Sequence, residues 1–212
     1  MNYAGRREAA GAVVQSIEAA GGQAFAVQGD VSKPQDVRAL FDAAIERFGR
    51  VHILVNNAGI ILYKRVDQTT DEEFDRLFAV NAKGTFNALR EASRRLEDGG
   101  RIINFSSTTT RLMLPTYASY CATKAAVEQM TRIFAREIGH RGITVNVVSP
   151  GPTNTKLFTE GKSEADIQKM AAMAALGRIG EPDDIANLVI FLASDEAGWI
   201  SAQNIGSNGG LA

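Results

Sequence analysis

The sequence predicts one α/β domain, residues 1–212, built on a doubly wound parallel sheet. Short runs rich in Val and Ile alternate with longer segments whose apolar residues recur at helical spacing, which is the pattern of βαβ units. Several of the short runs are apolar on both faces, as a sheet covered by helices on both sides requires. A length of 212 residues, 45% of them apolar and 22% charged, suits a single sizeable core.

The strand candidates are short and apolar. They are AFAV at 24–27, VHILV at 51–55, RIINF at 101–105, ITVNVV at 143–148 and a weaker QNIGS at 203–207. No strand-like run precedes the first predicted helix, which spans Arg6 to Ala20 and places Ala9, Val13 and Ile17 on one face.

Capping patterns predict where the other helices begin. Ser32 with Gln35 indicates an N-cap before an apolar stripe that ends at residue 48, and Thr70 with Glu73 repeats the capping-box pattern. Pro182 suits the first turn of a last helix. The residues that share one face of this last helix are Ile185, Leu188, Val189 and Leu192.

Composition and charge exclude several classes of function. A formal net charge of −1 and an isoelectric point near 6.2 provide no field that attracts a polyanion, so nucleic acid is not an expected partner. Cys121 is the single cysteine, and no stretch approaches the roughly 20 apolar residues of a membrane span. His52 and His140 lack partners at metal-ligand spacing. We therefore expect a cytoplasmic protein without a metal, a membrane partner or a disulfide.

The stretch TYASYCATKAAVEQM carries the strongest chemical signal. Tyr120 and Lys124 are four residues apart, which places a phenol and an ammonium on one face of a predicted helix. At a separation of ~4 Å and an effective dielectric of ~20, the ammonium favours the phenolate by about 4 kcal/mol, or roughly three pKa units. A tyrosine with its pKa lowered that far acts as an acid or base near neutrality. The alternative is a structural face with a half-buried tyrosine and a lysine whose stem packs along it.

Two serines follow a predicted buried strand. In RIINFSSTTT, Ser106 and Ser107 lie at the carboxyl end of the strand, where open α/β sheets bind their ligands. A hydroxyl there is placed to hydrogen-bond a carbonyl oxygen. Taken alone, two such serines more often form a turn or a helix cap.

These segments form an ordered set of motifs. VHILVNNAG, VNAKG, RIINFSS, YCATK and VSPGPTNT, in this order and spacing, resemble the short-chain dehydrogenase/reductase family. The resemblance covers essentially the whole chain, from Asn2 to Ala212, and looks closest to the 3-oxoacyl-carrier-protein-reductase-like branch. It implies a Rossmann-like fold and a hydride-transferring oxidoreductase.

The resemblance implies a catalytic set of four residues. Tyr120 would give or take the proton, and Ser107 would orient the substrate oxygen. Lys124 would lower the pKa of the tyrosine and hold the nicotinamide ribose. Asn81, in VNAKG, would support a water relay behind the lysine.

The resemblance also implies contacts to the adenosine half of the cofactor. Asp30 and Val31, in QGDVS, correspond to the pair that contacts adenine, and Asn57, Ala58 and Gly59, in NNAG, to the turn beside the adenine ribose. Asp30 is equally explained as a loop aspartate that caps the next helix, an alternative that the sequence leaves open.

Further contacts are implied around the nicotinamide. In SPGPTNT, Pro150 and Gly151 form a tight turn after a strand, and the family would place Thr153 and Thr155 around the carboxamide. Residues 156–180 resemble the family's mobile segment that covers substrate. The sequence does not identify that substrate.

The residues at the start of the chain bear on cofactor choice. Family members that prefer NAD usually end the second strand with an acidic residue, whereas here Asn2, Tyr3 and Ala4 are followed by Arg6 and Arg7. No carboxylate would repel a 2′-phosphate, and two guanidinium groups would bind it. NADP is therefore the expected cofactor, with NAD as the alternative. The alternative is that Arg6 and Arg7 are merely solvated residues in the first turn of a helix.

A glycine-rich phosphate-binding turn is not found in the sequence. No two of the 20 glycines are separated by a single residue, so no G-x-G spacing occurs. Compared with the family, the chain is expected to lack the first strand, the first helix and most of the second strand. In a sheet of order 3-2-1-4-5-6, this leaves the third and fourth strands about 14 Å apart with unpaired backbone. Otherwise these two strands pair directly, or another subunit fills the gap.

The expected function is NADP(H)-dependent interconversion of a small-molecule carbonyl and a secondary alcohol, with Tyr120 as general acid/base. The family is commonly tetrameric through helices near 70–92 and 117–139 and the C-terminal SNGGLA region, so a homo-oligomer, dimer or tetramer, is expected. The alternative is a catalytically silent chain that does not hold a dinucleotide and acts as an oligomeric or binding protein.

Overall fold

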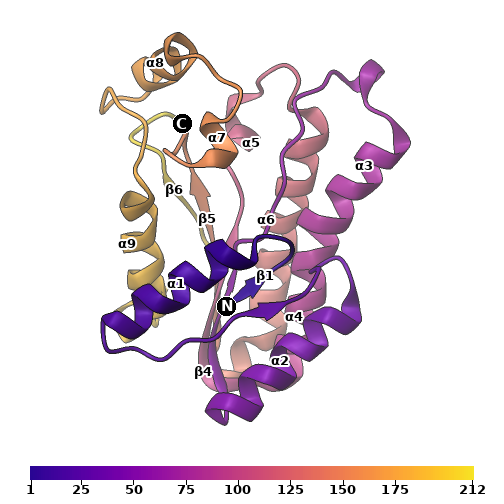
Figure 1. Ribbon diagram of the computed structural model, residues 1–212, viewed down its shortest axis with the longest axis vertical. Helices are drawn as coiled ribbons and strands as arrows, with labels where there is room; N and C mark the ends of the chain where they lie inside the picture. The colour runs from indigo at the N-terminus through magenta and orange to yellow at the C-terminus, as the bar shows by residue number, and fades with distance from the viewer.

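A computed structural model, which describes all residues 1–212, shows parallel sheets flanked by helices (Figure 1). The strands are β1 (Asn2–Tyr3), β2 (Val27–Gln28), β3 (Val51–Asn56), β4 (Leu96–Phe105), β5 (Thr144–Pro150) and β6 (Asn204–Ser207). The α-helices are α1 (Arg7–Ala19), α2 (Pro34–Phe48), α3 (Asp71–Phe78), α4 (Gly84–Arg95), α5 (Thr109–Leu112), α6 (Ala118–Ile138), α7 (Lys156–Thr159), α8 (Glu164–Met173) and α9 (Pro182–Ala193). The short helical turns are η1 (Val66–Gln68), η2 (Ala79–Lys83), η3 (Gly139–Arg141) and η4 (Asp195–Ala197). The predicted α/β class is confirmed.

The main sheet has four parallel strands in the order β3-β4-β5-β6. On one face α4 and α6 pack against it, and α2 packs on α4, while α9 packs against β4, β5 and β6 on the other face. The neighbouring residues Ile102 and Ile103 of β4 are each 1% exposed and belong to different apolar clusters. Successive side chains of a strand point to opposite faces, so this strand needs apolar residues at both positions.

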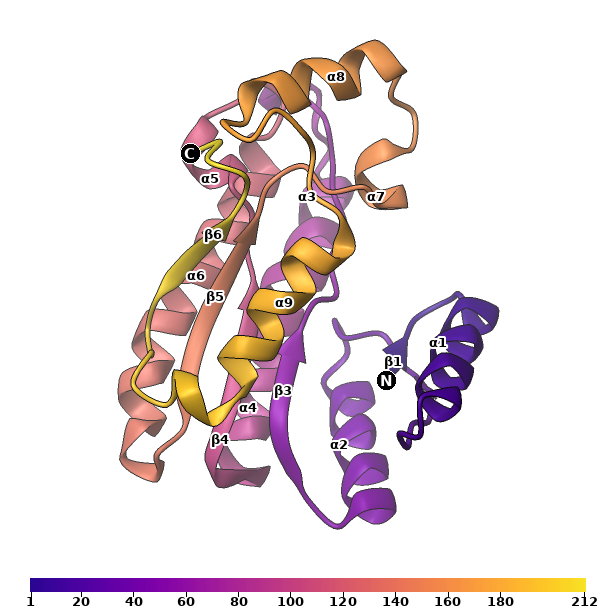
Figure 2. The ribbon, with the colours of Figure 1, turned by 90° about the vertical axis from the view of Figure 1, so that its left-hand side faces the viewer.

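The two N-terminal strands form a separate sheet. β1 pairs with β2 in parallel, with Asn2 opposite Val27, and neither strand pairs with β3. Figure 2 shows β1 and α1 standing apart from β3. The predicted break in the strand order is confirmed, and direct pairing of the AFAV strand with the VHILV strand is wrong.

The break leaves apolar side chains of β3 in solvent. Ile53 and Val55, which project to the same face of the strand, are 46% and 42% exposed. Val13 of α1 and Ile190 of α9 are also exposed, at 45% and 67%. The VHILV strand is therefore not among the strands that are covered on both faces, because Ile53 and Val55 are exposed.

Helix starts follow the predicted capping patterns in part. Thr70 and Glu73 form the predicted capping box at α3, and Pro182 occupies the first turn of α9. The Ser32 cap is wrong. Lys33 is the N-cap of α2, and the Ser32 hydroxyl instead donates to Asp30 Oδ1 over 2.7 Å.

Loss of the α3 cap gives a measurable stability change. We expect Thr70→Ala to lower the free energy of unfolding by about 1 kcal/mol, because the Glu73 amide loses the hydroxyl that accepts its hydrogen bond at 3.3 Å. Thr70→Ser keeps that oxygen and should recover most of the loss in denaturant titrations. Equal destabilisation by both variants would contradict the capping role.

The segment at 156–180 lies beyond the carboxyl ends of the strands. Its two helices, α7 and α8, are found there above β5 in Figure 1. Its predicted mobility stays a prediction. None of the helices combines the length and apolar character that crossing a bilayer demands.

Candidate active site

Three elements bring the predicted catalytic residues together. Ser107 is the second residue after β4, Tyr120 and Lys124 lie on α6, and Asn81 lies in η2. The Ser107 side chain lies close enough to the Tyr120 hydroxyl to favour its phenolate form, and Tyr120 is only 7% exposed. The carboxyl end of the sheet thus carries a buried phenol next to a serine hydroxyl, as predicted for this type of fold.

The structure separates the two serines that follow β4. Ser106 is 4% exposed, and its hydroxyl donates to Glu128 Oε1 over 2.6 Å. Ser107 is half-buried, and its oxygen accepts from the Thr109 hydroxyl over 2.9 Å. Because its own proton is not committed to that contact, Ser107 is able to donate to a substrate oxygen.

Lys124 is held under the site by the strand before Ser107. Its Nζ donates to the carbonyl oxygen of Phe105 over 2.9 Å and lies 5.8 Å from the centre of the Tyr120 ring. The residue is 5% exposed, and burial lowers the pKa of Lys124 to about 8.

The expected lowering of the tyrosine pKa is wrong in this structure. Burial raises the pKa of Tyr120 to about 12, and the hydrogen bond from Ser107 offsets only part of that rise. The ammonium of Lys124 lies 5.8 Å from the centre of the ring, and burial disfavours its charged form. Desolvation of the phenolate therefore outweighs the charge effect that the four-residue spacing suggested.

Asn81 is positioned by a π-helical turn that the sequence pattern did not indicate. Its Oδ1 accepts from the Ile60 amide, and its Nδ2 donates to the Ile60 carbonyl oxygen, both over 2.9 Å. Nδ2 also donates to Thr123 Oγ1 over 3.1 Å. A Cβ built on Gly59 would lie 3.4 Å from Asn81 Oδ1 and 3.5 Å from Lys124 Nζ, so the amide and the ammonium share one neighbourhood. π-turns of this kind are frequent at functional sites.

Sequence reasoning missed Thr123. It is fully buried, and its hydroxyl donates to the Tyr120 carbonyl oxygen over 2.7 Å while accepting from Asn81. Thr123 thereby links the tyrosine helix to the π-turn. Its place in YCATK, between the two reactive residues, was the available signal.

Asp30 and Val31 are engaged with neighbouring protein groups. Asp30 Oδ1 accepts from the amide and hydroxyl of Ser32, and its Oδ2 accepts from Arg76 over 3.2 Å. The Ser32 hydrogen bonds hold the pKa of Asp30 below its usual value. Val31 packs so closely that a Cβ on Gly84 would meet its Cγ2 at 2.7 Å. Asp30 therefore closes its own loop and does not cap α2, whose N-cap is Lys33, so the alternative of a helix cap is wrong, and a contact to adenine stays a prediction.

The other predicted cofactor residues lie in loops at the same end of the strands. Asn57 and Ala58 are exposed in the loop after β3, and Gly59 is half-buried there. Pro150 ends β5, and Gly151 follows it in close contact with the last strand, because a Cβ there would lie 2.9 Å from the Cα of Asn208.

The two threonines after this turn hydrogen-bond their own loop. Thr153 donates from its hydroxyl to the Gly151 carbonyl oxygen over 2.9 Å, and Thr155 precedes α7 as its N-cap. Arg6 and Arg7 are exposed at the start of α1, in the part of the chain that holds β1 and β2, and form no ion pair. Cofactor contacts by these four residues stay predictions.

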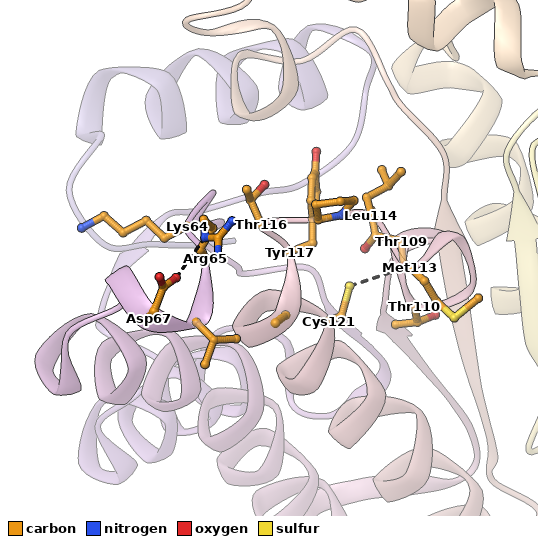
Figure 3. Close-up of a pocket in the computed structure, with 13 residues that line it drawn as sticks. Lys64, Arg65, Asp67, Thr109, Thr110, Met113, Leu114, Thr116, Tyr117 and Cys121 are labelled. Atoms are coloured by element: carbon orange, nitrogen blue, oxygen red, sulfur yellow. Dashed lines mark hydrogen bonds and ion pairs between the residues drawn. The ribbon is translucent and has the colours of Figure 1, made fainter.

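A cavity of about 760 Å³ adjoins the site without reaching Tyr120 (Figure 3). Tyr117, Thr109 and Cys121 line it, and the Cys121 thiol donates to the Thr109 carbonyl oxygen over 3.3 Å. The ring of Tyr117 lies 6.4 Å from that of Tyr120, so Tyr117 is common to the cavity and the site.

Comparisons with known proteins agree with this geometry. A family model described as enoyl-(acyl carrier protein) reductase matches residues 2–212. An uncharacterized oxidoreductase of Methylorubrum extorquens is 43% identical, over 100% of this chain and 86% of that protein. A chloroplastic NADPH-dependent aldehyde reductase-like protein of Arabidopsis thaliana is 45% identical, over 93% of this chain and 75% of that protein. The solved structure of angucycline C-6 ketoreductase LanV with bound NADP is 40% identical, with a TM-score of 0.93, and the match covers 99% of this chain and 84% of that chain.

The match runs through the motifs that form the site. It includes Ser107, Tyr120 and Lys124, which the fold brings to one end of a parallel sheet. The chain belongs to the short-chain dehydrogenase/reductase family and is an oxidoreductase of that family.

Proposed function

We propose that this protein interconverts a carbonyl compound and a secondary alcohol with NADP(H), and that Tyr120 moves the proton. The observation that carries the proposal is a buried Tyr120 with the Ser107 side chain close to its hydroxyl and the Lys124 ammonium 5.8 Å from the centre of its ring. The names of two relatives, an NADPH-dependent aldehyde reductase-like protein and a ketoreductase with bound NADP, support both the cofactor and the carbonyl.

The residues fit one half of this cofactor. Gly59 has no side chain next to the Lys124 ammonium, since a Cβ there would lie 3.5 Å from Nζ, and this absence suits a ribose bound beside the ammonium. At the diphosphate end, the 212 residues contain no G-x-G turn. On this proposal, Lys124 and Tyr120 hold the nicotinamide ribose.

The remaining predicted contacts are distributed along the cofactor. Thr153 and Thr155 face the carboxamide, with Pro150 and Gly151 as the turn that carries them. At the other end the assigned residues are Asp30, Val31, Asn57, Ala58, Arg6 and Arg7. When bound, the nicotinamide supplies or accepts the hydride.

The protein residues divide the remaining chemistry. Ser107 donates a hydrogen bond to the substrate oxygen, and Tyr120 gives its proton to that oxygen as the carbonyl becomes an alcohol. With the pKa of Tyr120 raised to about 12, the phenol is protonated at neutral pH and is ready to act as the acid in reduction. The charge of Lys124 stabilises the phenolate that remains. Asn81 fixes the loop at Ile60 behind the ammonium.

Reduction should therefore lose rate as the pH rises past the pKa of Lys124. The amine is charged below pH 8 and neutral above it, because burial lowers its pKa to about 8. Above that value the phenolate left by proton transfer has no adjacent positive charge, so kcat for reduction declines. A pH profile of kcat at saturating NADPH measures this. A flat profile to pH 10 would assign the lysine a purely structural role.

The cofactor is tested by titration calorimetry of the folded chain with NADPH and with NADH. We expect tighter binding of NADPH, and we expect the double substitution Arg6→Ala/Arg7→Ala to remove most of the difference by deleting the partners of the 2′-phosphate. Arg38→Ala is a matched surface control. No binding of either dinucleotide by the folded chain would favour the catalytically silent alternative.

The proposal includes a homo-oligomer, a dimer or tetramer, in the cytoplasm. Exposed apolar side chains occur on the helices expected to mediate assembly, with Phe74 of α3 41% exposed, Phe86 of α4 48% and Ile133 of α6 58%. Light scattering at several protein concentrations measures the molecular mass, and a monomer at all of them would exclude this assembly.

A further inference from the structure

Two further tyrosines extend the aromatic surface outward from the catalytic phenol. The Tyr117 ring lies 6.4 Å from the Tyr120 ring, and the Tyr63 ring lies 5.1 Å from the Tyr117 ring, nearly perpendicular to it at 79°. Tyr117 precedes α6, whereas Tyr63 comes from the loop after β3. Tyr63 is 38% exposed, so this row of rings leads from a buried hydroxyl to solvent. Aromatic surfaces of this kind pack preferentially against other rings.

Lys162 reaches the outer end of this row from the segment at 156–180. Its Nζ donates to the Tyr63 hydroxyl over 3.1 Å and to the Phe158 carbonyl oxygen over 2.7 Å. The ammonium also lies 4.4 Å from the centre of the Tyr63 ring and 4.7 Å from that of Phe158. The contact between Lys162 and Tyr63, which are 99 positions apart, thus joins the segment at 156–180 to the loop after β3.

The charge of Lys162 has no carboxylate partner. Nearby lysines are paired, Lys64 with Glu73 at 2.6 Å and Lys169 with Asp166 at 3.8 Å, whereas no carboxylate oxygen lies within 4.0 Å of Lys162. An ammonium has three donors, and two are used by neutral oxygens. One N–H is therefore available at the outer end of the row of rings, and the positive charge is offset only by Asp166, whose oxygens lie beyond 4.0 Å.

We infer that Lys162 is a specificity-determining residue and that the substrate is an aromatic ketone or aldehyde bearing a carboxylate or similar anionic oxygen. This rests on the proposed function, which places the carbonyl at Tyr120 and Ser107. The rings of Tyr117 and Tyr63 pack against the aromatic part, and Lys162 binds the anion with a charge-assisted hydrogen bond. The carbonyl, the aromatic ring and the anion of the substrate thus follow one another in the same order as the catalytic pair, the tyrosine rings and the Lys162 ammonium.

The experiment compares acetylbenzoate with its methyl ester, which differ in charge but share the ring and the ketone. We expect the wild-type kcat/KM to be about tenfold higher for the acid. Lys162→Met keeps the unbranched stem and removes the charge, so it should abolish this preference by raising KM for the acid while leaving the ester within about twofold. Lys169→Met, on the adjacent helix, is the matched control and should change neither.

A saturated analogue tests the aromatic part. Acetylcyclohexanecarboxylate keeps the anion and the ketone, and we expect its kcat/KM to fall below that of acetylbenzoate, because a saturated ring lacks the edge-to-face packing. Equal values for the two acids would overturn the aromatic assignment. A parallel loss for acid and ester in Lys162→Met, or a wild-type preference for the ester, would overturn the role of Lys162 in binding an anion.

Binding of naphthoate, followed by its fluorescence, separates this inference from the proposed function. The inference requires wild-type protein to bind naphthoate about tenfold more tightly than Lys162→Met. If wild type binds naphthoate more tightly in this way but turns over no ketone, the site for an anionic aromatic ligand is supported and the carbonyl chemistry is refuted. Turnover with naphthoate affinity unchanged in Lys162→Met would refute the inference alone.

Discussion

Tyr120→Phe should reduce turnover about a thousandfold while leaving the fold intact. The substitution removes one oxygen, which carries the proton that the proposed reaction transfers to the substrate. The phenyl ring keeps its packing in a position that is 7% exposed, and the loss of a buried hydroxyl costs little stability when its partner Ser107 is half-exposed. Binding of NADPH should therefore persist, so that the effect appears in kcat.

The measurement is single-turnover oxidation of NADPH with a carbonyl substrate, with far-ultraviolet circular dichroism to verify the fold. Tyr3→Phe is the matched control, since Tyr3 lies in β1 and its removal deletes the same oxygen elsewhere. Unchanged turnover in Tyr120→Phe would remove this residue from the mechanism. A fall caused only by a higher KM would assign it to substrate binding.

Lys124→Met should stabilise the protein at neutral pH while it abolishes activity. Burial lowers the pKa of Lys124 from 10.5 to about 8, and each pKa unit corresponds to about 1.4 kcal/mol, so holding the charged amine in the fold costs about 3 kcal/mol. Removing its hydrogen bond to the Phe105 carbonyl oxygen sacrifices about 1 kcal/mol. The free energy of unfolding should therefore rise by about 2 kcal/mol.

The pH dependence identifies the cause. Below pH 8 the lysine is charged in both the folded and unfolded states, and the full cost is present. Between pH 8 and 10.5 the unfolded chain binds more protons than the folded one, so wild-type stability rises with pH and the advantage of methionine shrinks.

Denaturant titrations at neutral and alkaline pH measure this change, with Lys169→Met as an exposed control. If the difference in the free energy of unfolding between wild type and Lys124→Met stayed constant from pH 8 to 10.5, packing and not burial of the charge would account for it. A lower free energy of unfolding for Lys124→Met than for wild type at neutral pH would show that burial of the charged amine does not destabilise the fold. Activity lost together with a gain in stability is the pattern of a residue retained for function.

Much of the fold was predictable from local patterns. The cores of β4 and β5 fell within apolar runs that no half-exposed strand would carry, and the Thr70 capping box and Pro182 marked two helix starts. Part of the site was predictable in the same way. Tyr120 and Lys124 share a face of α6, and Ser107 follows β4 at the carboxyl end of the sheet. These are consequences of spacing, which a sequence shows directly.

Other features depended on contacts between distant segments. The Ser32 cap was lost because Asp30 accepts from its amide and hydroxyl. The π-turn at Asn81 coincides with hydrogen bonds to Ile60 and Thr123, which lie 21 and 42 residues away. Neither partner is visible from the residues adjacent to the turn, so no local rule predicts it.

The sequence by itself determined most of the helices and strands of this protein, the family to which it belongs and the placing of Ser107, Tyr120 and Lys124 at one end of the sheet. Only the tertiary structure decided their protonation, the exposed edge at β3 and the position of Lys162 against Tyr63. The physical reason is that spacing along a helix or strand sets which side chains are neighbours, whereas burial is set by every segment that packs around them. Desolvation moved the pKa of Tyr120 upward where the spacing alone predicted a fall.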